Sequence, residues 1–181
     1  MLKKILLGFI AVIALILGIA AYQSGDYQVQ RSLAISAPAA ALFEQVNDHR
    51  KFVLWNPFGK LDPNVKNTFT GPATGIGSVC SWQGNRDIGA GSATITESRP
   101  GELVRERMDW KEPMEGTGFV EFTFKPEGDK TIVTWRMYGT NNFVGKVMCL
   151  FLSMDKMVGG PFEQGLLTLK GQAEAAAKKS P

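Results

Sequence analysis

Glu106 is the one residue whose type and setting suggest acid–base chemistry, because a predicted strand places it on an apolar face. Alternation in period two puts this carboxylate on the same side as Val104, Met108 and Trp110. If that face lines a cavity, burial would raise the pKa of Glu106, so that it could donate or accept a proton near neutral pH. Alternatively, Glu106 lies at the open end of the strand or pairs with an arginine such as Arg136, since buried charges are usually paired. Glu106 is thus the single catalytic candidate, and binding is a better-supported hypothesis than catalysis.

The other reactive side chains give little support for catalysis or metal binding. His49 is the only histidine, and no serine or cysteine nucleophile motif lies near it, so we expect a surface or structural role for it. Without a Cys-x-x-Cys pair or a second histidine, a zinc site of the usual ligand types is excluded, and no cofactor is expected. Cys80 and Cys149 could form one disulfide in an oxidising compartment, or they could remain two small buried thiols.

Aromatic residues on the predicted strands could form the wall of an apolar pocket. Apolar residues of a predicted C-terminal helix would face them, including methionine, which adapts to ligands of varied shape. The alternative is that these residues are ordinary core residues packed between helix and sheet. The predicted ligand-binding set is Trp82, Val104, Glu106, Met108, Trp110, Phe122, Trp135, Phe151, Met154 and Val158.

Period-two patterns predict the strands that would position these side chains. They cover residues 27–35, 65–70, 78–83, 93–98, 103–110, 118–125 and 131–138. Two short helices are predicted after the first strand, one beginning near Pro38 and one capped by Asp48. Turns rich in glycine and proline join the later strands, so we predict an α+β fold with one antiparallel sheet.

The C-terminal stretch, residues 143–178, carries apolar residues at spacings of three and four, which form one stripe on a helix. Gly159-Gly160-Pro161 divides this stripe, because glycine costs about 1 kcal/mol and proline about 3 kcal/mol in a helix interior. We therefore predict a kink or short interruption there, with the pocket-facing residues mainly within residues 147–158. A long helix laid across a curved sheet can enclose a cavity, which makes binding of an apolar molecule the leading hypothesis.

The N-terminus has the pattern of a membrane-targeting segment. Lys3 and Lys4 precede an uncharged run, residues 5–21, which would extend about 25 Å as a helix. This run is at the short end for a hydrocarbon core of about 30 Å, but it is longer than the usual signal-peptide core of about 7–15 residues. We predict a retained anchor over residues 1–23. The small residues Gly18 and Ala20 leave a cleaved signal, followed by secretion, as the alternative.

The two lysines also predict the orientation of this segment, because positive charge tends to stay in the cytoplasm. Residues 24–181 would then form one domain outside the cytoplasm, in the periplasm if the source is bacterial. Setting aside Lys3 and Lys4 lowers the formal net charge from +3 to +1, and the domain has no basic run except Lys178 and Lys179. The chain therefore lacks the electrostatic footprint of a nucleic-acid-binding protein.

A series of short motifs runs through residues 27–174. They are Trp55-Asn56-Pro57, Asp62-Pro63, Gly71-Pro72 with Gly75 and Gly77, Trp82-Gln83-Gly84-Asn85, residues 131–135, Gly139, Phe143 with Lys146, Met154-Asp155-Lys156, Phe162-Glu163, Gly165-Leu166 and Leu169-Lys170. In order and spacing they resemble the START-like or Bet v 1-like (SRPBCC) superfamily, in particular its bacterial polyketide cyclase/dehydrase-like members.

The resemblance implies a helix-grip fold, in which a curved antiparallel sheet wraps around a long C-terminal helix and leaves an internal cavity. Members bind lipids, sterols, polyketides or plant hormones; some cyclise or dehydrate polyketides, and others act as co-chaperones. No family catalytic motif matches this chain residue by residue, and a fold does not fix a function.

The resulting functional prediction is binding of a lipid-like or polyketide-like molecule in an internal cavity, at a membrane surface. One alternative is a polyketide cyclase/dehydratase-type enzyme that uses Glu106 as acid or base. The other is a protein-interaction module whose cavity is vestigial.

Overall fold

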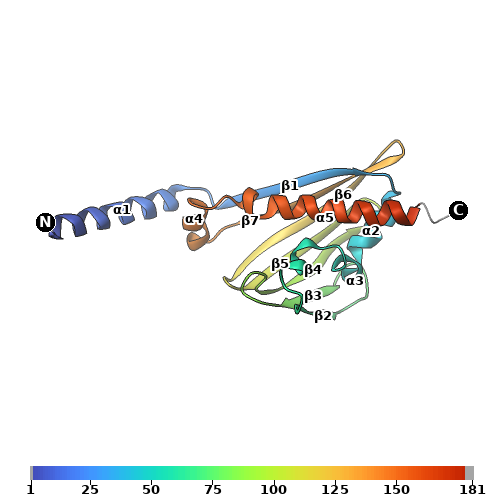
Figure 1. Cartoon of the computed structure of the whole chain (residues 1–181), viewed down its shortest axis with the longest axis horizontal. Coiled ribbons are helices and arrows are strands. Elements are labelled where there is room, and N and C mark those ends of the chain that lie inside the picture. The colour runs from blue at the N-terminus through green and yellow to red at the C-terminus, as the bar shows by residue number, and fades with distance from the viewer. Residues whose placement is uncertain (1, 178–181) are drawn as a thin grey trace.

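The computed structural model describes residues 2–177, in which a seven-stranded antiparallel sheet curves around a long C-terminal helix (Figure 1). The strands are β1 (Asp26–Ile35), β2 (Lys66–Thr70), β3 (Val79–Gln83), β4 (Ala90–Arg99), β5 (Leu103–Glu112), β6 (Gly116–Glu127) and β7 (Lys130–Thr140). Their spatial order is β1-β7-β6-β5-β4-β3-β2, so β2 to β7 form a meander and β1 pairs with β7. Each predicted strand is present, and the predicted α+β architecture is confirmed.

Alternation of side chains gives the sheet two unlike faces. On β7, Val133, Trp135 and Met137 are buried on the inner face, which is covered by helices. Arg136 lies between them on the outer face, where it pairs with Glu121 at 2.8 Å. The hydrophobic core therefore lies on the inner face, and charged pairs lie on the outer face.

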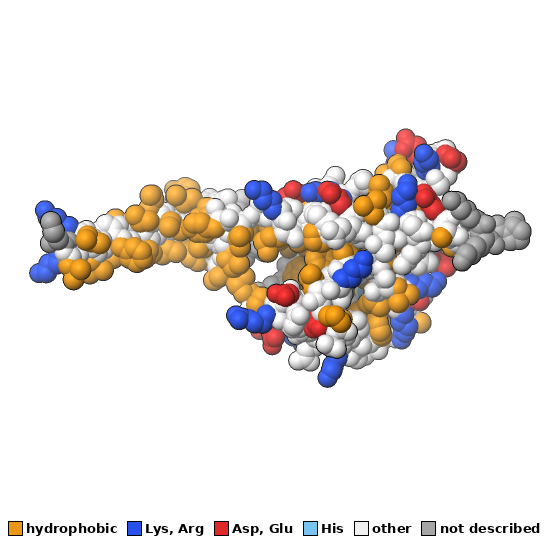
Figure 2. Space-filling model, in the orientation of Figure 1, with side chains coloured by type: hydrophobic (Ala, Val, Ile, Leu, Met, Phe, Trp, Pro, Cys, Tyr) orange, Lys and Arg blue, Asp and Glu red, His pale blue; other side chains and the backbone are white. Residues whose placement is uncertain are grey.

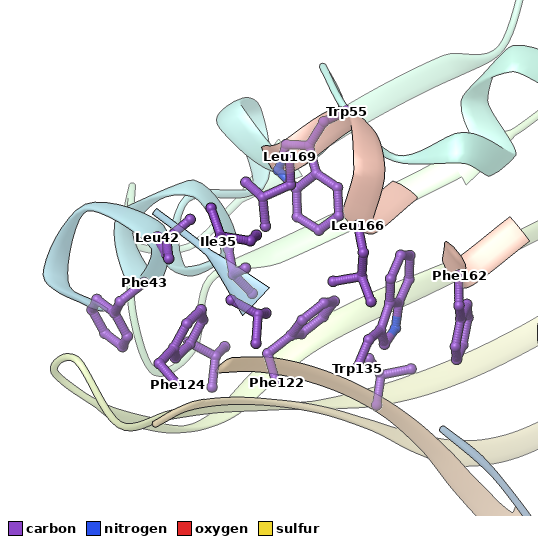
Figure 3. Packing of buried hydrophobic residues seen from close by; sticks show 14 of the residues in the cluster. Ile35, Leu42, Phe43, Trp55, Phe122, Phe124, Trp135, Phe162, Leu166 and Leu169 are labelled. Atoms are coloured by element: carbon purple, nitrogen blue, oxygen red, sulfur yellow. The ribbon is translucent and has the colours of Figure 1, made fainter. Parts of the chain in front are cut away.

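Short helices follow β1, as predicted: α2 (Ala39–Asn47) and α3 (His49–Phe52), with the 3-10 helix η1 (Pro57–Leu61) after them. Asp48 caps α3, since its side chain accepts a hydrogen bond of 2.8 Å from the amide of Arg50. These elements and α5 (Met154–Ala177) cover the inner face, and large side chains from both layers pack between them (Figure 3). Trp135 of β7, for example, stacks on Phe162 of α5 with ring centroids 4.1 Å apart.

The break in the C-terminal helix lies earlier than the sequence predicts. α4 (Phe143–Cys149) ends before residues 150–153, and α5 then continues through Gly159, Gly160 and Pro161. The prediction of an interruption at these three residues is wrong. Phe151 consequently lies in the connection between α4 and α5 rather than on a helix that faces the sheet.

Tertiary contacts of Arg31 explain why α5 is not interrupted there. Arg31 of β1 pairs with Asp155 at 2.7 Å and with Glu163 at 2.6 Å, so it contacts α5 on both sides of the glycines and proline. Gly159 fits between these contacts because a Cβ atom there would clash with the guanidinium of Arg31. The local cost of glycine and proline is offset by packing against β1, which a propensity argument does not include.

The N-terminal helix α1 (Leu2–Tyr22) extends away from the sheet (Figure 1). Its most apolar stretch has a mean hydropathy of 2.8, and Ala20 is the only buried residue of this helix. By length and composition α1 is able to cross a membrane, but a signal sequence would have the same properties.

Candidate ligand-binding site

The inner face of the sheet is tightly packed at one end and partly open at the other. Val104 of β5 and Phe122 of β6 have no exposed surface, and α2 contacts both of these strands. Further along β5, Met108 and Trp110 point to the same side but are only partly buried. Trp82 on β3 is also partly exposed. The inner face therefore has large apolar side chains that the helices do not fully cover.

Two glycines let aromatic rings approach the strands closely at the open end. A Cβ atom at Gly118 would lie 2.6 Å from the Tyr27 hydroxyl oxygen and 3.0 Å from the Trp110 ring. A Cβ atom at Gly139 would lie 2.8 Å from the same hydroxyl oxygen. Larger residues at either position would displace these rings. The two glycines therefore allow Tyr27 and Trp110 to form an aromatic surface across β1, β5, β6 and β7, which we call the aromatic floor.

A hollow lies beside the N-terminal part of α5, and hydrophobic side chains border it (Figure 2). Met154 and Val158, on the first two turns of α5, are only partly buried while packing against the core. Ligand pockets are concave and mostly apolar with few polar groups. We call the open end of the inner face the recess, and define it by the partly buried residues Trp82, Met108, Trp110, Met154 and Val158. The recess is concave and mostly apolar, as a ligand pocket is.

Two depressions lie mainly on the outer face of the sheet. One, of about 170 Å³, is lined by Gln30, Glu121, Thr123, Thr134 and Arg136. The other, of about 600 Å³, is lined by Asp26, Tyr27, Gln28, Thr117, Phe119, Tyr138, Gly139 and Thr140. Both are broadly open to solvent, whereas a ligand pocket buries most of its ligand. We therefore prefer the recess.

A buried chain of hydrogen bonds lies on the inner face beside the recess. Oε1 of Glu106 is 3.0 Å from Nε2 of His49, and Nδ1 of His49 is 3.2 Å from Oγ of Ser78. At most 2% of each of these residues is exposed. An ionised Glu106 can only accept, so Nε2 of His49 donates to it; Nδ1 of a neutral ring then accepts from the Ser78 hydroxyl. Each of the three side chains thus fixes the orientation of the next.

This hydrogen-bonded chain bears on two expectations. Of the surface or structural role expected for His49, the surface position is wrong, because His49 begins α3 directly over the inner face and only 1% of it is exposed, whereas its two hydrogen bonds agree with a structural role. Glu106 does not pair with Arg136, because the two side chains lie on opposite faces of the sheet and Arg136 donates to Glu121 instead. Glu106 is therefore a buried carboxylate whose partner is the only histidine of the sequence.

Cys80 of β3 belongs to the same neighbourhood. Burial raises the pKa of the Cys80 thiol to about 11, and the negative charge of Glu106 adds to this effect. Cys80 and Cys149 are both free thiols, so the disulfide alternative is not observed. A thiol with so high a pKa is a poor nucleophile at neutral pH.

Two polar atoms of the inner face have no hydrogen-bond partner among the described residues. Oε2 of Glu106 makes no such bond. Nε1 of Trp135 is fully buried and also lacks a partner. Buried polar groups are normally satisfied. An acceptor and a donor thus remain available on the inner face.

The predicted ligand-binding residues separate into three groups by exposure. Val104, Phe122 and Trp135 are core residues with at most 2% of their surface exposed. The partly buried group at the open end comprises Trp82, Met108, Trp110, Met154 and Val158. Phe151 is 69% exposed between α4 and α5, so its predicted position on a pocket-facing helix is wrong. Glu106 is buried but keeps its free oxygen, and ligand contact by any of these residues stays a prediction.

Sequence reasoning missed Tyr27, Ser78 and the role of His49 as a partner of Glu106. Tyr27 could have been found from the sequence, since it occupies the apolar face of the first predicted strand. The contacts of His49 could not have been found, because His49 lies 57 residues from Glu106 and 29 from Ser78 in the chain.

A curved antiparallel sheet that grips a long C-terminal helix, with an apolar recess between them, defines a protein of the helix-grip fold. No protein-family model and no curated protein sequence matches this chain. Solved structures do match it, at sequence identities at which the likeness concerns the fold alone.

The Zhui aromatase/cyclase from Streptomyces sp. R1128 is similar over 86% of this chain and 98% of its own, with 14% identity and a TM-score of 0.62. Ginseng major latex-like protein 151 from Panax ginseng matches 82% of this chain and 98% of its own, with 11% identity and a TM-score of 0.56. The Aha1 protein from Colwellia psychrerythraea matches 82% of this chain and 96% of its own, with 16% identity and a TM-score of 0.56. These likenesses concern the fold alone, and they confirm the predicted helix-grip fold.

Proposed function

We propose that this protein binds an apolar or amphipathic small molecule in the recess. The observation that carries the proposal is the fall in burial along the inner face, from Val104 to Met108 and Trp110 on one strand. Leaving large apolar side chains partly uncovered costs about 25 cal/mol for each Å² not buried, and a ligand would recover this free energy. The similarity to a protein named as an aromatase/cyclase supports a lipid-like or polyketide-like ligand.

The free oxygen of Glu106 indicates that the ligand also carries a hydrogen-bond donor. His49 holds this carboxylate through Oε1, which leaves Oε2 free to accept a hydrogen bond. A ligand with a hydroxyl or amine group near one end would satisfy this oxygen and bury its apolar body against the aromatic floor. An amphipathic molecule therefore fits better than a pure hydrocarbon.

The membrane part of the proposal rests on α1. We infer that residues 1–23 stay attached as an anchor and that residues 24–181 form the binding domain. Lys3 and Lys4 favour a cytoplasmic N-terminus, which would put the domain outside the cytoplasm, in the periplasm of a bacterium. Removal of α1 as a signal sequence, followed by secretion, is the alternative.

Native mass spectrometry of the full chain in nanodiscs tests the binding proposal. We expect a bound molecule that survives collisional removal of loosely held lipid. Met108→Trp should lower the bound fraction at least several-fold, because the larger ring would fill the recess. Arg107→Trp is the matched control, since its neighbouring side chain points to the outer face. Equal retention by both variants, or no bound molecule in the unaltered protein, would refute the proposal, and a fully packed interior with no cavity would favour the interaction module.

A second candidate function is acid–base catalysis on the bound molecule. The hydrogen-bonded chain from Ser78 through His49 to Glu106 favours it, since an oriented carboxylate next to an imidazole can exchange a proton with a ligand. Glu106→Gln should then retain the bound molecule but stop any change in its mass or absorbance over time. Identical turnover in this variant would exclude Glu106 from the reaction.

A further inference from the structure

Six large hydrophobic side chains are exposed together at the end of the domain next to α1. They are Phe143 (48%), Val144 (55%), Met148 (38%), Phe151 (69%), Leu152 (46%) and Met157 (51%). We call this cluster, which lies on α4, on the connection to α5 and on the first turn of α5, the α4 patch. Single exposed hydrophobic residues are ordinary, whereas a cluster of them marks an interaction site.

The α4 patch lies beside the last turns of α1. α4 contacts α1, and Ala20 is fully buried although every larger hydrophobic residue of α1 except the half-buried Ile16 is exposed. The amide of Asn141, just before α4, donates a hydrogen bond of 2.8 Å to the carbonyl oxygen of Gly25, just after α1. Hydrophobic side chains continue from α1 onto the adjoining part of the domain (Figure 2). The apolar surface of α1 and the α4 patch are therefore continuous.

The length of α1 sets the depth at which the α4 patch would meet a bilayer. Its 21 residues extend about 31 Å, against a hydrocarbon thickness of about 30 Å. With Lys3 and Lys4 among the headgroups on one side, Tyr22 would reach the opposite boundary, where tyrosine is enriched. Ala20 lies about 3 Å from Tyr22 along the helix axis. A helix packed against Ala20 would thus lie at the boundary between hydrocarbon and headgroups.

We propose that the α4 patch inserts into the lipid interface and forms a second membrane contact beside α1. This inference rests on the proposed retention of α1 as an anchor. Hydrophobic residues of an interfacial helix enter the boundary of headgroups and acyl chains while cationic residues stay among the headgroups. Lys146 and Lys156 supply such cations, and the nearby Asp155 is already neutralised by Arg31 at 2.7 Å.

Insertion would give the recess a defined position relative to the lipid. Met157 belongs to the α4 patch, and its neighbours Met154 and Val158 are partly buried at the open end of the inner face. One turn of α5 therefore contacts the bilayer and borders the recess. An amphipathic lipid could pass between them without crossing bulk water.

Spin-label accessibility of the full chain tests the insertion directly. Native Cys149 is replaced by Ser, while Cys80 stays because it is buried. Nitroxide labels are then attached in separate Ile13→Cys, Leu152→Cys and Asp129→Cys variants, in vesicles of phosphatidylcholine with a minor share of phosphatidylglycerol. Ile13 reports on α1, Leu152 on the α4 patch, and Asp129 on the exposed turn between β6 and β7.

We expect the Leu152 label to resemble the Ile13 label, with high accessibility to oxygen and low accessibility to a water-soluble nickel chelate. The Asp129 label should give the opposite result. A Leu152 label that resembles Asp129 while Ile13 stays in lipid would overturn the insertion but leave the anchor intact. Low accessibility of Leu152 to both reagents would also overturn it, because a protein partner would then cover the patch. An Ile13 label in water would refute the anchor itself. A label at Phe151→Cys repeats the measurement at a second patch position.

Discussion

Nε2 of His49 lies 3.0 Å from Oε1 of Glu106, and no more than 2% of either side chain is exposed. α3 brings the imidazole over the inner face, and β5 supplies the carboxylate from below. Burial of such a pair is costly unless each partner satisfies the other. The pair therefore links the stability of the domain to the chemistry of the recess.

Loss of one partner of this pair should be strongly destabilising. His49→Leu leaves a buried carboxylate without its partner, so we expect a loss of about 3–5 kcal/mol in the free energy of unfolding. The double variant His49→Leu with Glu106→Leu should cost less than His49→Leu alone, because no unpaired charge remains. Chemical unfolding of the full chain in detergent micelles measures both. Lys51→Ala, which removes an exposed pair with Glu44, is the control and should change stability by no more than about 1 kcal/mol.

Cys80 should resist alkylation at neutral pH. The pKa of about 11 leaves little Cys80 thiolate, so the rate of alkylation of Cys80 should rise steeply as pH rises toward that value. The partly exposed Cys149 should be alkylated at lower pH than Cys80. A raised folded-state pKa also means that this thiol stabilises the fold below its ordinary pKa of 9.0 and that the contribution is lost as pH rises toward about 11. Mass spectrometry after timed alkylation gives the rates. Equal labelling of both cysteines at neutral pH would contradict the buried placement of Cys80.

The two glycines in the middle of α5 should respond to alanine in opposite directions. Gly160→Ala should stabilise the protein by up to about 1 kcal/mol, because alanine is the better helix former and no atom lies within 4 Å of the new methyl group. Gly159→Ala should destabilise it, because its methyl group would displace Arg31 from Asp155 and Glu163. Thermal unfolding of the matched pair measures the difference. Stabilisation by both substitutions would mean that the contact with Arg31 is not maintained.

The orientation predicted from the N-terminal lysines can be tested with reporters. An alkaline phosphatase fused after Pro181 should be active, and a cytoplasm-dependent fluorescent protein at the same position should be dark. Exchange of Lys3 and Lys4 for Glu should weaken this bias. The reverse pattern of reporter activity in the unaltered chain would exclude an extracytoplasmic domain.

Much of the fold could be predicted from the sequence because its signals are local. Alternation of Val104, Met108 and Trp110 identified a strand and its inner face, and Asp48 marked the start of α3. The path of α5 could not be predicted in this way, because Arg31 supports it from 124 and 132 residues away. Helix propensity at Gly159 and Pro161 was outweighed by that contact.

The candidate site, like the fold, could be predicted from the sequence only where its signals are local. The sequence by itself determined that Glu106 would share an apolar face with aromatic neighbours, since a strand turns alternate side chains to the same side. Only the tertiary structure decided that His49 would be its partner, that Phe151 would be exposed between α4 and α5, and that the recess would lie beside α5. These outcomes depend on which distant segments meet when the sheet curves and the helices pack, and no spacing within one segment encodes them.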